Sequence, residues 1–565
     1  MIDVRMNMID RAVAAVSPRR GAQRLAARAA LQAGSAIVAG APPVQPGGFL
    51  SPRGGFHAGH KERRGLRGWI ARLRSANQDN AQLSNVVAYS RDAAMNMPMG
   101  TAAIERPITF TIGTGLMAIP EIDGKAVGIS DDAAAALNRQ IASDYDEYMS
   151  STDPDAERTA TGYELQEIVM RGVLESGDIA ALRCWPEDQI GRMAFTAWRL
   201  VEADRIVSPL GHIEGGRLNG NGNVCVAGVE VDEYHAPVAL HILKKAPDSA
   251  AGRGSRVAND TVRIPLWGEQ SGLPTSLHVM SRKRPEQSRG VPLLAPVIEV
   301  LGQISTLTQS ELFAAVMTST LAIIYKSPGA TGMPEADYGA ADDEARLVTG
   351  GGAYDGPGDR GGNIRLEPGA VLEIDNDAEV DMKSPGRPNP AFDPFFQALV
   401  RQISAAIEVP FEVLMLHFIS SYSASRAALE VFYLTVQRRR GWMESHWCAP
   451  GYRAWLHEQV VRGVYKMPGF LTNPARRQAW SKVRHRGDGK ISLDPAREAK
   501  ALEVHEAHGW STGAQITAGL NGGDYDSNIT VRIAEHKRFV DGGLPIPNAN
   551  GGGTAPAADA QQQEN

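Results

Sequence analysis

The sequence has little cysteine and no long apolar run. Only Cys184, Cys225 and Cys448 occur among 565 residues, which is too few for a disulfide framework and fits a reducing compartment. They lack Cys-x-x-Cys spacing, so a zinc site is not expected. The longest uncharged apolar run, residues 312–325, is too short and too rich in Ser and Thr to span a bilayer. We therefore expect no metal, no cofactor and no membrane segment.

An excess of positive charge is also missing. The chain carries 58 Lys+Arg against 64 Asp+Glu, a formal net charge of −6. The chain as a whole is therefore not a basic nucleic-acid binder, and any contact with DNA must be local or loose.

Hydrolase signatures are absent too. No Gly-x-Ser-x-Gly or matched Ser–Lys pattern occurs. His505 and His508 are three residues apart, whereas the helix of a zinc protease needs a spacing of four. A two-metal nuclease would need clustered carboxylates, but the acids crowd a Gly-rich segment, 326–389, instead. We expect that the protein is not an enzyme.

What is present is a chain long enough for several cores, with an ordinary 43% hydrophobic and 22% charged content. Apolar periodicity predicts helices at 85–97, 131–148 and 162–176, and 101–111 fits either a helix or a strand. Strands are predicted at 181–185, 192–201, 224–231 and 238–242, the last two as a hairpin closed by 232–237. The sequence thus predicts an α+β domain over about 80–290.

A long helix is predicted after residue 296. Its apolar stripe is narrow and its other faces carry uncharged polar residues, among them Gln303 and Gln309. Such a helix suits packing against identical neighbours in a ring, and an ordinary core helix fits the pattern equally well.

The stretch 390–463 reads as a helix, a short loop and a much longer helix. Pro410 stops the first helix because it biases Val409 away from the α region. The loop 414–422 is apolar and aromatic, yet almost uncharged. Ser423 or Ser425 is expected to cap the following helix. A basic run, Arg438-Arg-Arg440, lies farther along that helix.

Three strings in this stretch carry a family resemblance: Ile403-Ser-Ala-Ala-Ile-Glu-Val-Pro-Phe-Glu412, Ser421-Tyr-Ser-Ala-Ser-Arg-Ala-Ala-Leu429 and Trp455-Leu-His-Glu-Gln-Val-Val-Arg-Gly463. A fourth marker is Arg284-Pro-Glu-Gln-Ser-Arg-Gly-Val-Pro-Leu-Leu-Ala-Pro296, and an Ile-Gly-Thr-Gly element ends at Gly115. Together they resemble the portal (head–tail connector) proteins of lambda-type tailed phages. The resemblance covers roughly residues 80–540.

The resemblance implies a portal fold with an α/β wing, two stem helices, a small α/β clip, a long wing helix and a helical C-terminal region, arranged as a cyclic ring. The implied parts follow in chain order: a basic, partly disordered arm (1–80), the wing (81–290), the first stem helix (291–325), the clip (326–389), the second stem helix (390–409), the tunnel loop (410–424), the long wing helix (425–466), a helical crown-like region (467–542) and a disordered tail (543–565).

The resemblance also implies where the functional residues lie. The channel-lining loop would be formed by Leu416, His417, Phe418, Ile419, Ser420, Ser421 and Tyr422. Subunit contacts are expected at Gln303, Gln309 and Arg426. Docking of partners on the clip is expected at Asp355, Asp359, Arg360 and Arg365.

The implied function is that of a portal: a ring, dodecameric in the virion, at one capsid vertex, through which double-stranded DNA passes with weak, non-specific contact. Its implied partners are further copies of itself, the terminase large subunit, the major capsid or scaffold protein and head-completion or tail connector proteins, in the virion and in the host cytoplasm during assembly. The alternative is a head-maturation protease or another DNA-processing enzyme, for which the sequence supplies no catalytic pattern.

Overall fold

The computed structural model describes residues 73–187, 190–218, 222–244, 261–269, 271–320, 323–326, 371–374, 392–418, 421–490, 495–521 and 523–543. The fold below is that of the compact unit that begins at Arg74. Calls that fall elsewhere in the chain, including the arm, most of the clip and the C-terminal tail, lie outside the described residues.

Helices dominate the first part of this unit. They are η3 (Ala76–Gln82), α3 (Leu83–Asn96), α4 (Pro98–Thr111), α5 (Gly124–Val127), α6 (Asp131–Ser150) and α7 (Gly162–Ser176), with strand β1 (Met117–Pro120) after α4. α7 has the predicted bounds because Thr161 and Glu164 form a capping box at its start. Residues 101–111, which fitted either a helix or a strand, lie in the helix α4, and Pro98 is in the first turn of this helix.

Two antiparallel sheets follow. The first has the order β3-β2-β8 and the second the order β4-β5-β6-β7. Their strands are β2 (Asp178–Cys184), β3 (Ala197–Glu202), β4 (Val224–Val226), β5 (Val229–Val231), β6 (Pro237–Leu243), β7 (Thr261–Pro265) and β8 (Ser276–Met280), with the short helix η4 (Ala203–Arg205) after β3.

The strand predictions hold only in part. The predicted hairpin exists, with Val229 opposite Leu240. The single strand predicted at 224–231 is instead two, because Ala227 and Gly228 both adopt positive φ, 49° and 84°, and form a turn. The strand expected from residue 192 starts only at Ala197.

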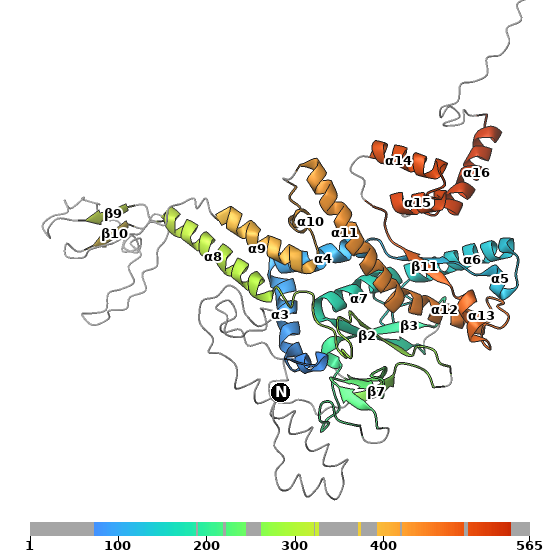
Figure 1. Cartoon of the computed structure of the whole chain (residues 1–565), viewed down its shortest axis with the longest axis horizontal. Coiled ribbons are helices and arrows are strands. Elements are labelled where there is room, and N and C mark those ends of the chain that lie inside the picture. Colours follow the sequence, from blue (N-terminus) through green and yellow to red (C-terminus); the bar gives the residue numbers. More distant parts are fainter. Residues whose placement is uncertain are drawn as a thin grey trace, which may run out of the picture. The chain divides into compact units, whose positions relative to one another are not determined.

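Two long helices, α8 (Ile298–Thr320) and α9 (Phe392–Ile407), run side by side (Figure 1). Between them in the sequence lie two short parallel strands, β9 (Ile323–Lys326) and β10 (Val371–Ile374). The first stem helix was predicted to reach residue 325. It ends at Thr320, because the β-branched and aromatic residues that follow pair with β10 instead.

The long helix predicted at 425–466 is a succession of three segments. They are α11 (Tyr422–Met443), a π-helical turn η6 (Glu444–Cys448) and α12 (Ala449–Val461), preceded by the short helix α10 (Phe411–Met415). The π turn ends two residues before Pro450, whose backbone nitrogen carries no hydrogen and cannot donate the hydrogen bond that a regular α-helix requires there.

The region 467–542, predicted as helical, also contains a strand. Its elements are α13 (Pro474–Trp480), β11 (Val483–Arg486), α14 (Pro495–Ala507), α15 (Gly513–Asn521) and α16 (Tyr525–Asp541). β11 pairs antiparallel with β1. The side chain of Asp524 caps α16 by accepting a hydrogen bond from the backbone N–H of Ser527.

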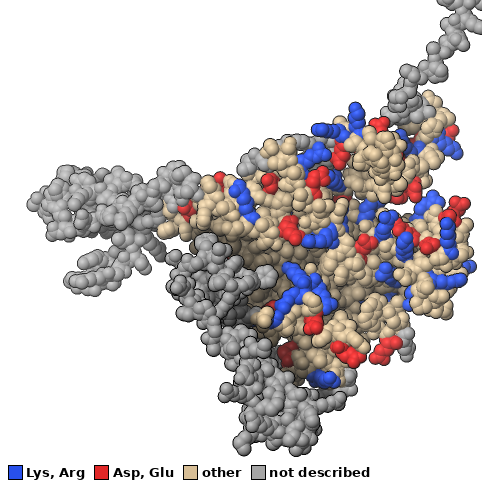
Figure 2. Space-filling model, in the orientation of Figure 1, with Lys and Arg blue, Asp and Glu red and all other residues tan. Residues whose placement is uncertain are grey.

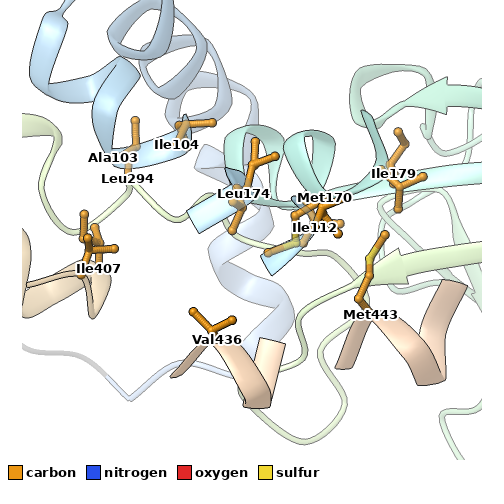
Figure 3. Packing of buried hydrophobic residues seen from close by; sticks show 14 of the residues in the cluster. Ala103, Ile104, Ile112, Met170, Leu174, Ile179, Leu294, Ile407, Val436 and Met443 are labelled. Atoms are coloured by element: carbon orange, nitrogen blue, oxygen red, sulfur yellow. The ribbon is translucent and has the colours of Figure 1, made fainter. Parts of the chain in front are cut away.

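Three clusters of buried apolar side chains hold these elements together. The largest joins α4, α7, β2, α9, α10 and α11, and it contains Val436 and Met443 of α11 with Met170 and Leu174 of α7 (Figure 3). A second, rich in aromatic rings, joins α6 and α12 to residues 465–483. The third lies on the four-stranded sheet. Residues 467–483 therefore belong to the α+β core, contrary to the predicted division.

Candidate functional site: the loop between α10 and α11

The loop that the sequence singled out is reached through a sharp break after α9. Glu408 directly follows α9 and adopts φ = 59°, a left-handed conformation that a helix cannot continue through. Val409 is buried, and Pro410 stands at the N-cap of α10. The prediction that the helix stops before Pro410 is confirmed.

The exposed loop is shorter than predicted. Leu414 was placed in it, but it lies in α10 with only 1% of its surface exposed. A short helix has formed here because Val413 and Leu414 can both reach the main core from it. α10 ends at Leu416, whose φ is 51°, and the backbone N–H of His417 donates to the carbonyl of Glu412 at 3.1 Å.

The loop exposes large apolar side chains. Leu416 is 57% exposed and Phe418 53% exposed, and His417 is also exposed. Ser421 is exposed, whereas Ile419 and Ser420 lie outside the described residues and Tyr422 is described only by its backbone, as the first residue of α11. The structure thus leaves Leu416, His417 and Phe418 outside the core of their own chain.

The cap of α11 differs from the prediction. The hydroxyl oxygen of Ser421 accepts a hydrogen bond from the backbone N–H of Ala424 at 3.4 Å. Ser425 is instead buried on the inner side of the helix, so it cannot stand at the end. The sequence offers three serines at alternate positions, and burial of the third decides which one caps.

The basic run on α11 is bound within the chain. Arg440 donates to the backbone carbonyls of Thr111 (2.9 Å) and Phe110 (3.0 Å), at the end of α4, and to that of Asp488 at 2.8 Å. Arg439 donates to the last carbonyl of α9, that of Ile407, at 2.8 Å. Cationic side chains at helix C-termini satisfy carbonyls that have no partner in the helix.

Burial lowers the pKa of Arg439 to about 10 and also lowers that of Arg440. The neighbouring Arg438 forms an ion pair with Glu408. Lys and Arg are interspersed with Asp and Glu over the face that Figure 2 shows. Arg439 and Arg440 are therefore not available to phosphate groups, and the exposed Arg438 is paired with a carboxylate.

The predicted subunit-contact residues are accessible. Gln303 and Gln309 are exposed on α8, and Arg426, on the first turns of α11, lies 4.0 Å from the carboxylate of Glu430. The four predicted clip residues, Asp355, Asp359, Arg360 and Arg365, lie outside the described residues. The structure does not bring the loop residues and these predicted contacts together into one enclosed site.

The comparison with known families gives the decisive observation. A family model described as "Phage portal protein, lambda family" matches residues 62–440, about two thirds of the chain. The chain belongs to this portal family. Among curated relatives, "Portal protein" of Escherichia phage N15 is 25% identical over 534 residues, 89% of this chain and 94% of that protein. "Portal protein B" of Escherichia phage lambda is 24% identical over 529 residues, 89% and 93% of the two chains.

Solved structures are also similar. A chain from "Virion of native gene transfer agent (GTA) particle" is 14% identical and matches 78% of this portal protein and 93% of its own length, with a TM-score of 0.37. A chain from "Neck of native GTA particle computed with C12 symmetry" is 15% identical, with 77% and 93% covered and a TM-score of 0.35. The matched family is a structural component of phage particles, and no catalytic family matches in its place.

The structure explains the portal marker 284–296. Arg289, 5% exposed, donates to both carboxylate oxygens of the fully buried Asp178, at 2.6 and 3.0 Å. It also donates to the backbone carbonyls of Ala203 (2.6 Å) and Ile206 (2.7 Å). Asp178 accepts further hydrogen bonds from the backbone N–H of Gly290 and from the ring of His278. The sequence marks residues 284–296 as a family string, but it does not predict the hydrogen bonds of Arg289, because their acceptors come from distant segments of the chain.

The Ile-Gly-Thr-Gly marker forms one wall of a cavity of about 440 Å³. Its carboxylates are already bound: Arg171 donates to Glu105 and Glu167, and Asp488 accepts from the N–H and hydroxyl of Thr114. Among the described residues no group of three or more His, Cys, Asp or Glu could hold a metal ion. None of the described helices combines the length and apolarity that a membrane span needs.

Proposed function

We propose that this portal protein assembles into a closed ring, a dodecamer, at one vertex of a phage capsid, and that double-stranded DNA is packaged and later ejected through its centre. The observation that carries the proposal is a group of exposed apolar side chains on α8, where Leu312, Phe313 and Val316 are 65%, 66% and 51% exposed. Phe395, on the neighbouring α9, is 55% exposed.

Four such side chains on two adjacent helices are unfavourable in water, and contiguous apolar patches on soluble proteins mark interaction sites. The face contains few charges, because α8 has acids only at Glu299 and Glu311 and no Lys or Arg. An uncharged helical surface favours another protein over DNA as the partner. In a ring built by rotation, each subunit contacts one neighbour through one surface and the other neighbour through a different surface. Because the ring closes, no subunit is left with an uncovered contact surface.

The loop between α10 and α11 is proposed to line the narrowest part of the channel. Leu416 and Phe418 would touch the DNA without pairing with its phosphates, while the basic run of α11 is bound to helix ends. Each phosphate that a protein neutralises raises its affinity for DNA and makes that affinity more dependent on salt concentration. A neutral lining therefore suits a conduit through which DNA must slide.

The partners are proposed from the same assignment. Residues 326–389 would form the clip that docks the terminase large subunit during packaging and head-completion or tail connector proteins afterwards, and the outer ring would meet the major capsid or scaffold protein. Assembly would take place in the host cytoplasm. Replacing residues 350–362 by a short linker should spare ring formation and impair packaging or head completion. A normal phage yield from that variant would show that this segment docks nothing essential.

The ring is tested by electron microscopy and mass photometry of the purified chain, where rings with a central hole are expected. The variant Leu312→Ser/Phe313→Ser should assemble less well. Its matched control is Leu210→Ser/Ile213→Ser, which replaces side chains that are 67% and 81% exposed elsewhere. A chain that stays monomeric at high concentration and moderate salt would overturn the proposal.

The channel lining is tested separately with His417→Ser/Phe418→Ser. Rings should still assemble with near-normal stability, because both side chains are exposed in the free chain, while the length or retention of packaged DNA changes. If the variant instead fails to fold or to assemble, these side chains serve the fold or the interface and not the channel.

A further inference from the structure

Helix α11 carries two apolar faces. One is the inner face, where Leu429, Phe432, Val436 and Met443 are between 0% and 8% exposed and belong to the main core. A helix at the surface of a globular protein normally has one apolar stripe and a polar face opposite to it. The face of α11 that points away from the core is therefore the surface through which this helix can contact a partner.

The opposite face is also apolar. Ala424, Ala427, Val431 and Leu434 are all exposed, Val431 by 65% and Leu434 by 66%. We call these four residues the outer seam. Their spacing of three, four and three residues is that of a coiled-coil contact stripe. Leu429 and Val436 follow Ala427 and Leu434 by two positions, which places them about 200° around the helix from the seam.

The charges around the outer seam are few and are paired with one another or with Glu408, which favours a protein over a nucleic acid as its occupant. The flanking positions hold Ala428, Glu430, Thr435 and Gln437, and Arg438, four residues after Leu434, lies on the same face and pairs with Glu408. Glu430 already forms ion pairs with Lys490 and Arg426. Binding along a phosphate backbone needs Lys or Arg side chains on the contacting face. A helical protein surface with few charges fits the seam instead.

The area of the seam shows that its occupant makes other contacts as well. The seam extends over eleven residues, about 15 Å along the helix, and a helix is about 10 Å wide. It therefore offers on the order of 150 Å², far below the roughly 800 Å² that each partner contributes to a stable interface. A short peptide held by the seam alone would not stay bound. A second copy of this chain would, since it meets the uncharged apolar face of α8 in the same encounter.

We propose that the outer seam of α11 packs against a second copy of this chain and forms, with the α8 face, the lateral contact between neighbouring subunits. The inference rests on the ring of the proposed function and adds a specific second contact surface in the wing. It also gives α11 a defined position in the assembly: its inner face packs on α4 and α7 of its own subunit, and its outer face packs on the neighbour.

The test is the variant Val431→Ser/Leu434→Ser in the full chain, beside the control Leu210→Ser/Ile213→Ser. The seam variant should keep the far-UV circular dichroism and thermal unfolding of dissociated subunits, because both side chains are exposed there. Its concentration at half-assembly, measured by mass photometry, should rise at least tenfold, since burying one Val or Leu side chain is worth about that factor. The control should assemble like the unaltered chain.

A photoreactive benzoylphenylalanine at position 434 identifies the occupant. Crosslinking to a product of twice the chain mass supports the proposal. Crosslinks only within one chain, crosslinks to DNA in packaged particles, or unchanged assembly of the seam variant would overturn it while the ring itself stands. If the unaltered chain forms no ring, the proposed function fails first, and the seam inference fails with it.

Discussion

Replacing Arg289 by Met should severely destabilise the α+β core. The substitution keeps an unbranched apolar stem but removes the guanidinium group. It leaves the carboxylate of Asp178, which has no exposed surface, without its cationic partner, and it leaves the backbone carbonyls of Ala203 and Ile206 without their donor. An unpaired buried charge is among the most costly defects in a folded protein.

The magnitude follows from the burial of both partners. Breaking a buried ion pair by removing one partner costs about 3–5 kcal/mol. The matched control is Arg484→Met. The Arg484 side chain is 70% exposed and pairs with Glu121 on the surface, where such a pair contributes only about 0–1 kcal/mol after solvent screening. The two variants remove the same group from an ion pair, so the difference in their effects isolates the contribution of burial.

The free energy of unfolding is measured by urea denaturation of the chain at one fixed concentration, with tryptophan fluorescence as the probe, because Trp198 is buried on β3 of the same sheet. The double variant Asp178→Asn/Arg289→Met should recover part of the loss, since it removes the orphaned charge. If Arg289→Met costs no more than Arg484→Met, the cluster does not hold the α+β core together and the reasoning is refuted.

The same cluster gives a pH dependence. Burial by itself would raise the pKa of Asp178, but the charge of Arg289 and the hydrogen bonds from His278 and Arg289 outweigh it and hold that pKa well below its ordinary value. A carboxyl group with a depressed pKa in the folded state stabilises the fold above its unfolded pKa, near 4, and loses this contribution as the pH falls below that value. In the Asp178→Asn/Arg289→Met variant, stability should fall less steeply between about pH 4 and pH 2.

Three further predictions concern single sites. Gly290→Ala should cost about 1–3 kcal/mol or more, because a Cβ at this position would lie 1.8 Å from the carbonyl oxygen of Gly177; unchanged urea denaturation would contradict this contact. Arg440→Met should cost about 1–3 kcal/mol, since three backbone carbonyls lose their donor, and a loss as small as that of Arg484→Met would contradict its role. Burial raises the pKa of Tyr145 and Tyr148, so stability should be lost as the pH rises above about 10, where these tyrosines ionise in the unfolded chain; urea curves that coincide at pH 8 and pH 10.5 would refute this.

How far the sequence predicts this structure depends on how local the deciding signal is. The bounds of α7 are predicted because a capping box lies within four residues of its start. The pairing of β11 with β1 is not predicted, because the two strands are separated by more than 350 residues and neither is long enough to show a clear alternation. For the same reason residues 467–486 were assigned to a helical region and not to the core.

The site predictions divide in the same way. The apolar, uncharged character of the loop after α10 is a local property, and the structure leaves Leu416, His417 and Phe418 exposed. The residue at which the loop begins cannot be predicted from the local sequence, because it depends on whether Leu414 reaches the main core. The role of Ser421 as the cap likewise depends on the burial of Ser425 against other elements.

The arginines of α11 show why composition alone misleads about DNA contact. Arg438-Arg-Arg440 reads in the sequence as a basic run, and such runs commonly bind nucleic acid. In the fold, one of the three pairs with Glu408 and the other two donate to carbonyls at helix ends. A guanidinium group held by backbone carbonyls is fixed in direction and cannot turn toward a passing phosphate. If the loop after α10 lines the channel, Arg439 and Arg440 therefore stabilise its wall and do not bind the DNA, and the weak salt dependence of DNA movement expected for such a channel follows in part from how these two side chains are bound.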